Sequence, residues 1–141
     1  LGAPVGPLED LGLMGFVETQ VDLLFANETE LCALFQTEDF DAACAALQSK
    51  VKLAAVTRGE QGSVILSQGE RLEIAAEPVH KVVDTTGAGD QYAAGFMFGL
   101  STGRSLGDCG RLASIAAAEV ISHYGPRPQV QLKDLAAAKG I

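Results

Sequence analysis

Short apolar runs alternate along the chain with segments whose apolar residues recur at helical spacing. The apolar runs predict strands at 21–25, 53–56, 63–66, 71–74 and 79–83. Helical spacing predicts helices at 28–35, 40–49, 88–100, 105–122 and 132–138. The segment Ser67-Gln68-Gly69-Glu70 separates two of the strands and predicts a hairpin turn. This alternation indicates an α/β fold whose mostly parallel sheet carries helices on both faces.

The composition is that of one globular domain or of a part of one. The 141 residues are 48% hydrophobic, which is enough for a core, and no apolar run approaches the roughly 20 residues of a membrane span. The net charge of −8 and the scattered Lys and Arg residues argue against a nucleic-acid partner, which requires a basic patch. The widely spaced Cys32, Cys44 and Cys109 favour reduced thiols in a cytoplasmic protein over disulfides or a zinc site.

The segment Asp84-Thr85-Thr86-Gly87-Ala88-Gly89-Asp90 lies where the predicted strand 79–83 gives way to a helix. Its two glycines let the backbone turn N–H groups toward an anion, and the positive end of the helix adds to them. Asp90 would oppose an anion there unless it has a chemical role, such as accepting a proton from a hydroxyl that attacks a phosphoryl group. The pattern therefore indicates phosphoryl transfer. The simpler alternative is a tight turn with Asp90 as an N-terminal helix acid.

Two common glycine-loop motifs do not fit this segment. A P-loop requires a lysine directly after its glycines, and the residue at that position is Asp90. A dinucleotide-binding fingerprint requires a third glycine at the position that Tyr92 occupies. An oxidoreductase is therefore a remote alternative.

The same segment, with the aromatic and small residues at 92–96, resembles the signature of the PfkB/ribokinase family of carbohydrate and nucleoside kinases. Asn27-Glu28-Thr29-Glu30 resembles the family's N-x-x-E element, and Thr57-Arg58-Gly59-Glu60-Gln61-Gly62 resembles its T-x-G-x-x-G nucleotide loop. The three motifs stand in family order, and each follows a predicted strand, where open α/β sheets bind ligands. The resemblance implies a three-layer ribokinase-like fold.

Catalytic roles follow from this resemblance and from the chemistry of phosphoryl transfer. Asp90 is expected to be the general base toward the acceptor hydroxyl. The backbone N–H groups of Ala88, Gly89 and Asp90 are expected to neutralise charge on the transferring phosphoryl group, and Gly87 makes their approach feasible.

The resemblance implies ATP and Mg²⁺ as cofactors. Glu30 is expected to act through Mg²⁺ or its waters, because this cation keeps several waters and needs only one or two carboxylates; Asn27 is expected to hydrogen-bond the phosphate or a metal water. Alternatively, Asn27 and Glu30 form a capping box for the helix that starts at residue 28, and both roles can hold together. Asp84 is expected to help build a site for a monovalent cation such as K⁺, or else to fix the turn through local hydrogen bonds.

The second motif is expected to contact the nucleotide. Thr57 and Gly59 are expected to meet the phosphates or ribose, and Gly62 to permit the turn. Arg58 is either a phosphate clamp or a solvated side chain. The alanine-rich stretch 113–118 borders the adenine by resemblance, or else packs closely against another helix.

The histidines offer no metal site by spacing. His80 and His123 have no Cys, His or carboxylate at ligand spacing, so His123 is expected to have a helix-end role.

Members of the family are about twice as long as this chain. Residues 1–141 are therefore expected to be the C-terminal, nucleotide-binding and catalytic part of a single kinase domain, without the N-terminal substrate and lid half. Chain 1–141 by itself is expected to show negligible activity.

The predicted function is transfer of the γ-phosphate of ATP to an alcohol of a sugar or nucleoside. Residues 116–128 resemble the adenosine-kinase-like bacterial members, which makes adenosine the first expected acceptor and a sugar the second. The alternative is a nucleotide-binding regulatory or scaffold domain without turnover. The oligomeric state stays open, with a homodimer as one option.

Overall fold

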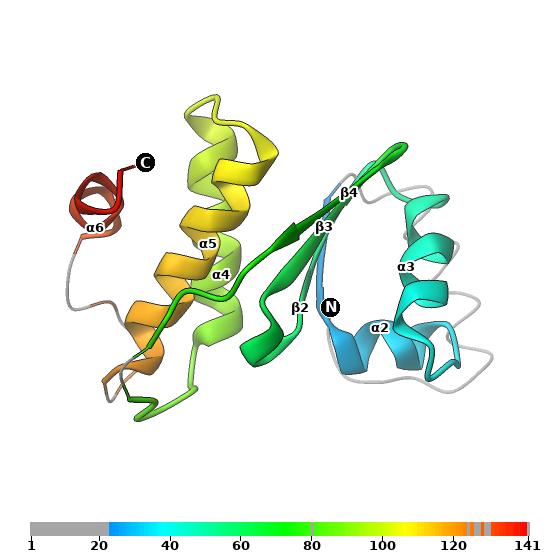
Figure 1. Cartoon of the computed structure of the whole chain (residues 1–141), viewed down its shortest axis with the longest axis horizontal. Coiled ribbons are helices and arrows are strands. Elements are labelled where there is room, and N and C mark those ends of the chain that lie inside the picture. The colour runs from blue at the N-terminus through cyan, green and yellow to red at the C-terminus, as the bar shows by residue number, and fades with distance from the viewer. Residues whose placement is uncertain (1–22, 80, 124, 126–127, 129–130, 141) are drawn as a thin grey trace. The chain divides into compact units, whose positions relative to one another are not determined.

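The computed structural model describes residues 23–79, 81–123, 125, 128 and 131–140, which form two compact units (Figure 1). The first unit contains residues 23–58 and Val64–Glu73, and the second contains Gly59–Ser63 and the described residues from Ile74 onward. The predictions for Val21, Asp22, His80, Tyr124, Pro126 and Arg127 lie outside the described residues.

The first unit is built around a four-stranded sheet in the order β1-β2-β3-β4, except that the first residue of β3, Ser63, and the last residue of β4, Ile74, belong to the second unit. The strands are β1 (Leu23–Asn27), β2 (Leu53–Thr57), β3 (Ser63–Ser67) and β4 (Glu70–Ile74). β1 and β2 run parallel, in a register that pairs Asn27 with Thr57. The links from β2 to β3 and from β3 to β4 are too short for a crossover, so these pairs are antiparallel and the sheet is mixed.

Helices α2 (Glu28–Leu34) and α3 (Phe40–Gln48) lie on one face of this sheet (Figure 1). α3 begins at the cap residue Asp39, whose side chain accepts a hydrogen bond from the N–H of Ala42 at 3.1 Å. The core between helices and sheet consists of apolar side chains spaced one helical turn apart or on alternate strand positions. Its members are Leu24, Leu31, Phe40, Ala43, Cys44, Leu47, Val51, Ala54, Val56, Val64 and Leu66. Burying each of the larger ones contributes roughly 1.5–3 kcal/mol.

The second unit is helical, with α4 (Ala88–Ser101), α5 (Leu106–Ile121) and α6 (Leu132–Ala138). α4 and α5 lie side by side (Figure 1), and glycines permit their close approach. A Cβ at Gly95 would lie 2.8 Å from the carbonyl oxygen of Leu112, and one at Gly99 would lie 2.8 Å from Cys109 Sγ. Ala113 is fully buried at this contact, so the packing alternative for its alanine-rich stretch is correct there.

The strand predicted at 79–83 is wrong for the described residues of that segment. Val79 and Lys81–Val83 pair with no strand, and Val82 is 55% exposed. Instead, the N–H groups of Val83 and Asp84 donate to the carbonyl of Ile121, at 2.8 and 3.2 Å, near the end of α5. An apolar run predicts a strand only if a neighbouring strand supplies partners, and here a helix end supplies them.

The other predicted strands and the predicted helices are present, with ends that shift slightly. The largest shift is in β1, which ends at Asn27 rather than at Phe25. The hairpin turn lies between β3 and β4, as predicted. None of the described helices combines the length and the apolar character needed to traverse a lipid bilayer.

The three cysteines carry free thiols, with Cys44 and Cys109 buried and Cys32 half-buried. Burial raises the pKa of each thiol above its ordinary value, so all three stay protonated at neutral pH. Cys44 accordingly packs as a small apolar side chain in the core of the first unit.

Candidate active site

The first backbone N–H groups of α4 are only partly hydrogen-bonded within the described residues. Its cap residue, Gly87, has a φ of +82°, a left-handed conformation that glycine adopts without strain, and no side chain caps the helix. The N–H of Ala88 donates to Thr85 O at 3.2 Å, but those of Gly89 and Asp90 have no acceptor within the described residues. Two adjacent donors at a positive helix end are therefore available to an anion.

Asp90 stands on the same first turn with its side chain exposed. Outside the backbone of its own helix, a Cβ built on Gly89 would meet no atom of the described residues within 4 Å, so these residues leave room beside the donors. An exposed carboxylate next to unpaired amides can accept a proton from a hydroxyl while the amides hold the anion that the hydroxyl attacks. The predicted base and the three predicted amide donors thus lie on one turn, where the N–H of Ala88 is already bonded to Thr85 O and those of Gly89 and Asp90 are not bonded within the described residues.

Asp84 fixes the turn before α4. Its Oδ1 accepts hydrogen bonds from Thr86 Oγ1 at 2.7 Å and from Thr86 N at 3.0 Å, and its Oδ2 accepts one from Gly125 N at 3.4 Å. The Thr86 hydroxyl, and then its N–H, hold the pKa of Asp84 below the ordinary value. The local hydrogen-bonding alternative for Asp84 is confirmed, while its role toward a monovalent cation stays a prediction.

The nucleotide-loop residues Gly59 and Gly62 belong to the same unit as α4. Gly59–Gln61 forms one turn of 3₁₀-helix, closed by the bond from Gly62 N to Gly59 O at 3.1 Å. Gly62 has a φ of +87°, and a Cβ there would lie 2.0 Å from the carbonyl oxygen of Ile74. Only glycine fits this position, so the prediction that Gly62 permits the turn is confirmed.

A buried hydrogen bond ties this turn to α4, and sequence reasoning missed it. The hydroxyl of Tyr92 donates to Ser63 Oγ at 2.7 Å, and both side chains are buried. Burial raises the pKa of Tyr92 to about 12, so the phenol stays neutral. The sequence signal was a tyrosine on the apolar face of a predicted helix, because such a hydroxyl needs a partner.

Asn27 and Glu30 form the capping box that was one of their two predicted roles. Asn27 Oδ1 accepts from Glu30 N at 2.8 Å, and Glu30 Oε1 accepts from Asn27 N at 2.9 Å. Asn27 is the last residue of β1, and its register partner, the half-buried Thr57, is the last residue of β2. The three predicted residues of the first unit therefore meet at one end of the parallel pair.

The arrangement at Asn27 and Glu30 fits Mg²⁺ only through water. In the described part of the chain no group of three or more His, Cys, Asp or Glu side chains is placed to hold a metal. Glu30 is exposed, and a cation that keeps its waters needs no more than one such carboxylate. Glu30 is the residue that would hold it, and this role stays a prediction.

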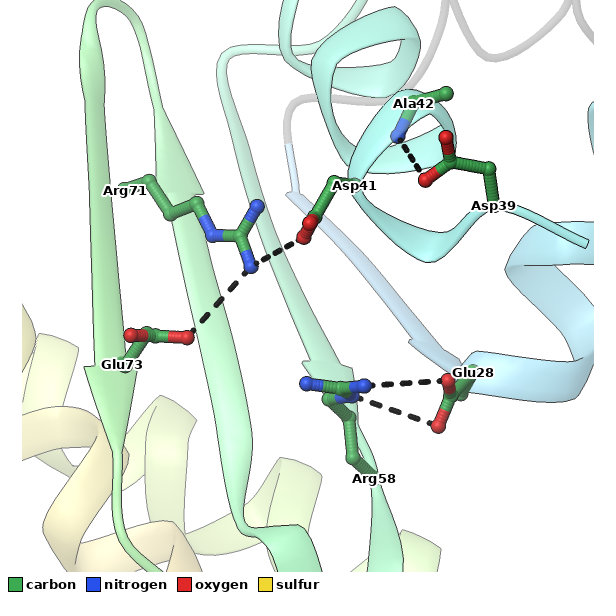
Figure 2. Close-up of polar contacts among 7 residues, drawn as sticks. All are labelled: Glu28, Asp39, Asp41, Ala42, Arg58, Arg71 and Glu73. Carbon is green, nitrogen blue, oxygen red and sulfur yellow. Dashed lines mark hydrogen bonds and ion pairs between the residues drawn. The ribbon is translucent and has the colours of Figure 1, made fainter.

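Arg58 is not a solvated side chain, because it is half-buried and paired with a carboxylate of its own unit, while its role as a phosphate clamp stays a prediction. Figure 2 shows its guanidinium forked onto the carboxylate of Glu28, at 3.3 and 3.4 Å. The same guanidinium lies over the ring of Phe40, 3.9 Å from its centroid. Glu28, which follows Asn27, is thereby linked to Arg58, which follows Thr57, within the first unit.

A second arginine continues this network. Arg71 Nη2 lies 3.0 Å from Asp41 Oδ1 and 3.6 Å from Glu73 Oε1 (Figure 2). These are partly exposed pairs, so each contributes at most about 1 kcal/mol to stability. Their place on β4 and α3 makes them structural contacts of the first unit.

His123 is paired, contrary to the expectation that no carboxylate stands at a useful spacing. Its Nε2 lies 2.9 Å from Oε1 of Glu119, four residues earlier at the end of α5. Side chains four apart are neighbours on a helix, so the spacing itself carried the signal. The predicted helix-end position of His123 is correct.

Comparison with known proteins identifies the relatives of this chain. The sequence profile of the pfkB family carbohydrate kinases matches residues 9–132. An uncharacterized sugar kinase of Archaeoglobus fulgidus is 37% identical over 118 residues, which cover 83% of this chain and 46% of that protein. The chain thus spans less than half the length of such a relative.

Solved structures extend the comparison to the fold. The adenosine kinase from Sinorhizobium meliloti matches with a TM-score of 0.89 and 46% identity, over 93% of this chain and 40% of that one. The Arabidopsis thaliana ribokinase, solved with ribose and ATP, matches with a TM-score of 0.80 and 31% identity, over 91% of this chain and 43% of that one. The expected ribokinase-like α/β fold is confirmed by these matches, but the predicted mostly parallel sheet is wrong for the four described strands, which form a mixed sheet.

Proposed function

The chain belongs to the pfkB family of carbohydrate kinases, and from this membership we propose that the full-length protein transfers the γ-phosphate of ATP to an alcohol of a sugar or nucleoside. The observation that carries the proposal is the open first turn of α4. There the N–H groups of Gly89 and Asp90 have no acceptor in the described residues, and the carboxylate of Asp90 is exposed. An anion and a hydroxyl are the partners that such a turn can use together.

In the proposed reaction the acceptor oxygen attacks the γ-phosphorus of ATP. The bond from that phosphorus to the bridging oxygen breaks, ADP leaves, and the hydroxyl proton passes to the carboxylate of Asp90. The N–H groups of Gly89 and Asp90 donate to the phosphoryl oxygens, where negative charge must be held during transfer. Gly87, through its positive φ, turns these groups outward without a capping side chain in the way.

The cofactor proposal is ATP with Mg²⁺. A ribokinase solved with ATP is among the similar structures, which supports the nucleotide. Mg²⁺ bound with ATP supplies positive charge at the phosphates. On the protein side, Glu30 is proposed to hold a metal water, Asn27 to orient that carboxylate through the capping box, and Thr57 and Gly59 to contact the nucleotide.

Adenosine is the first proposed acceptor. The support is the 46% identity to the S. meliloti adenosine kinase, together with the resemblance of residues 116–128 to adenosine-kinase-like members. Ribose and other sugars come second, in line with the lower identity of 31% to the Arabidopsis ribokinase.

The test is ADP release by the full-length protein, with ATP and Mg²⁺, against a panel of nucleosides and sugars. Acceptor-dependent ADP release supports the proposal, and a tenfold or greater preference in kcat/KM for a free sugar over adenosine would overturn only the acceptor choice. ATP binding without any acceptor-dependent turnover would instead favour the alternative, a nucleotide-binding regulatory or scaffold domain.

Chain 1–141 by itself belongs in the same assay. Because phosphoryl transfer depends mainly on positioning, and because the relatives are more than twice as long, we expect weak ATP binding and negligible transfer from this chain alone. Turnover comparable to that of the full-length protein would contradict this expectation and leave the kinase proposal standing.

A further inference from the structure

The hydrogen bond between Tyr92 and Ser63 joins two segments that lie far apart in the sequence. The two oxygens are 2.7 Å apart, and the side chains belong to residues 29 positions apart. Tyr92 is 4% exposed and Ser63 is 2% exposed, so water does not compete for either hydroxyl. A short, buried bond of this kind fixes the relative position of the segments that carry it.

Both partners stand next to residues of the proposed site. Ser63 directly follows Gly62, where the nucleotide turn Gly59–Gln61 ends. Tyr92 lies on α4, two residues after Asp90, and two helical positions differ by about 200° around the axis. Asp90 is accordingly exposed while Tyr92 points into the unit. On this first part of α4, Tyr92 therefore faces the interior of the unit, and Asp90, the proposed base, faces outward.

The geometry makes the hydroxyl more than a packing group. Apolar contacts of the buried ring have no preferred direction, so by themselves they resist a small rotation of α4 about its axis less than a hydrogen bond does. A 2.7 Å bond from the hydroxyl to Ser63 is directional, and such a rotation would break it. On the other side of the bond, Gly62 packs so closely against the backbone of Ile74 that no Cβ fits, so Ser63 follows a tightly packed position of the same unit.

We propose that the Tyr92–Ser63 hydrogen bond is a positioning contact that holds the nucleotide turn at Gly59–Gly62 and the Asp90 turn of α4 in the relative orientation that phosphoryl transfer requires. This inference rests on the proposed kinase function. Tyr92 and Ser63 act through their neighbours and touch neither ATP nor the acceptor. Their contribution is an orientation that the aromatic ring alone does not supply.

The test uses the full-length protein and the variants Tyr92→Phe, Ser63→Ala and the double variant. Tyr92→Phe keeps the buried ring and removes only the hydroxyl, so it is the variant least apt to disturb folding. Loss of the bond is expected to raise KM for ATP and to lower kcat, so that kcat/KM for ATP falls by about threefold to tenfold. KM for the acceptor is expected to stay within twofold of the parent value. The double variant is expected to match the more affected single variant, because both substitutions remove one bond.

A matched control separates positioning from general stability. Cys109→Ala removes a buried thiol of α5 that packs against Gly99, near the C-terminal end of α4. Cys109 lies outside the proposed site. We expect this variant to lower Tm while leaving kcat/KM for ATP within twofold. Equal kinetic losses in Cys109→Ala and Tyr92→Phe at similar Tm, unchanged kinetics in Tyr92→Phe, or multiplicative losses in the double variant would each overturn the inference.

Failure of this inference and failure of the proposed function give different results. If Asp90→Asn abolishes transfer while Tyr92→Phe keeps the parent kinetics, the positioning contact is refuted and the kinase proposal stands. If the parent protein shows no acceptor-dependent ADP release, the proposed function itself fails.

Discussion

The first turns of α4 and α5 carry the same Gly-Asp pair at the same helix positions, but the two helix ends differ. In α5 the pair is Gly107-Asp108, and the cap residue Ser105 accepts a hydrogen bond from Asp108 N at 3.2 Å. In α4 the pair is Gly89-Asp90, and the cap residue Gly87 has no side chain to offer. The acids at both ends are exposed, so exposure does not distinguish them.

This difference shows that the capping residue, rather than the acid, separates a structural helix end from a candidate binding end. A serine cap satisfies one of the free helix donors and contributes about 0.5–2 kcal/mol to stability. The start of α4 forgoes that contribution, so that within the described residues the N–H of Asp90 has no acceptor, unlike the N–H of Asp108. An acid in the first turn of α5 needs no role beyond its favourable interaction with the helix dipole.

The largest effect is expected when each of the two aspartates is replaced by asparagine, one at a time, in the full-length protein. Asp90→Asn is expected to lower kcat by on the order of 10² to 10⁴, because the amide cannot accept the hydroxyl proton, and to change ATP affinity little. Asp108→Asn, at the equivalent position of α5, is expected to leave kcat unchanged and to cost about 0.3–1 kcal/mol of stability. Steady-state kinetics on both variants decide the matter. A kcat for Asp90→Asn within threefold of the parent would remove Asp90 as the base.

The two glycines provide the next test. Among the described residues, and apart from its own helix backbone, a methyl group at Gly89 meets no atom within 4 Å, and one at Gly107 meets only Ser105 Oγ at 3.9 Å. Alanine therefore fits both helices and is expected to stabilise each by up to about 1 kcal/mol. Only Gly89→Ala places the methyl where a phosphate must approach the amides, so kcat/KM for ATP is expected to fall about 10- to 100-fold. Comparable ATP kinetics for Gly89→Ala and Gly107→Ala would contradict an anion site at α4.

The start of α2 is an intermediate case, because its cap is complete and a metal role is proposed as well. Glu30→Gln preserves a capping box, since glutamine also accepts the bond from Asn27 N, but it removes the charge. We expect a several-fold rise in the Mg²⁺ concentration needed for half-maximal rate, with Tm nearly unchanged. Glu30→Ala breaks the box as well and is expected to cost about 0.5–2 kcal/mol more. An unchanged Mg²⁺ dependence in Glu30→Gln would leave Glu30 with the capping role alone.

The smallest effect is expected at the α5 cap. Ser105→Ala removes the acceptor for Asp108 N and is expected to lower stability by about 1 kcal/mol without any change in kcat or in KM for ATP. Denaturant unfolding of this variant, alongside its kinetics, measures both. A kinetic defect at Ser105→Ala would show that the two helix ends are not functionally distinct.

Local patterns in the sequence determined most of the elements and motifs. The spacing of apolar residues predicted α3, α6 and the β3–β4 hairpin close to their observed bounds, because helix and strand periodicities act within a few residues. The capping box at Asn27 and the turn held by Asp84 were likewise among the predicted alternatives, since their partners lie two or three residues away.

The tertiary structure decided the contacts between residues that are distant in sequence. The segment 79–83 has the apolar character of a strand, but its end bonds to α5 because the helix terminus has a carbonyl to offer. Arg58 could not be assigned from its neighbours, because the groups that hold it, Glu28 and Phe40, come from α2 and α3. The Tyr92–Ser63 bond depends in the same way on α4 packing against the residue that follows the turn Gly59–Gly62. Hydrogen bonds and ion pairs of this kind act only at contact distance, and folding alone brings such partners together.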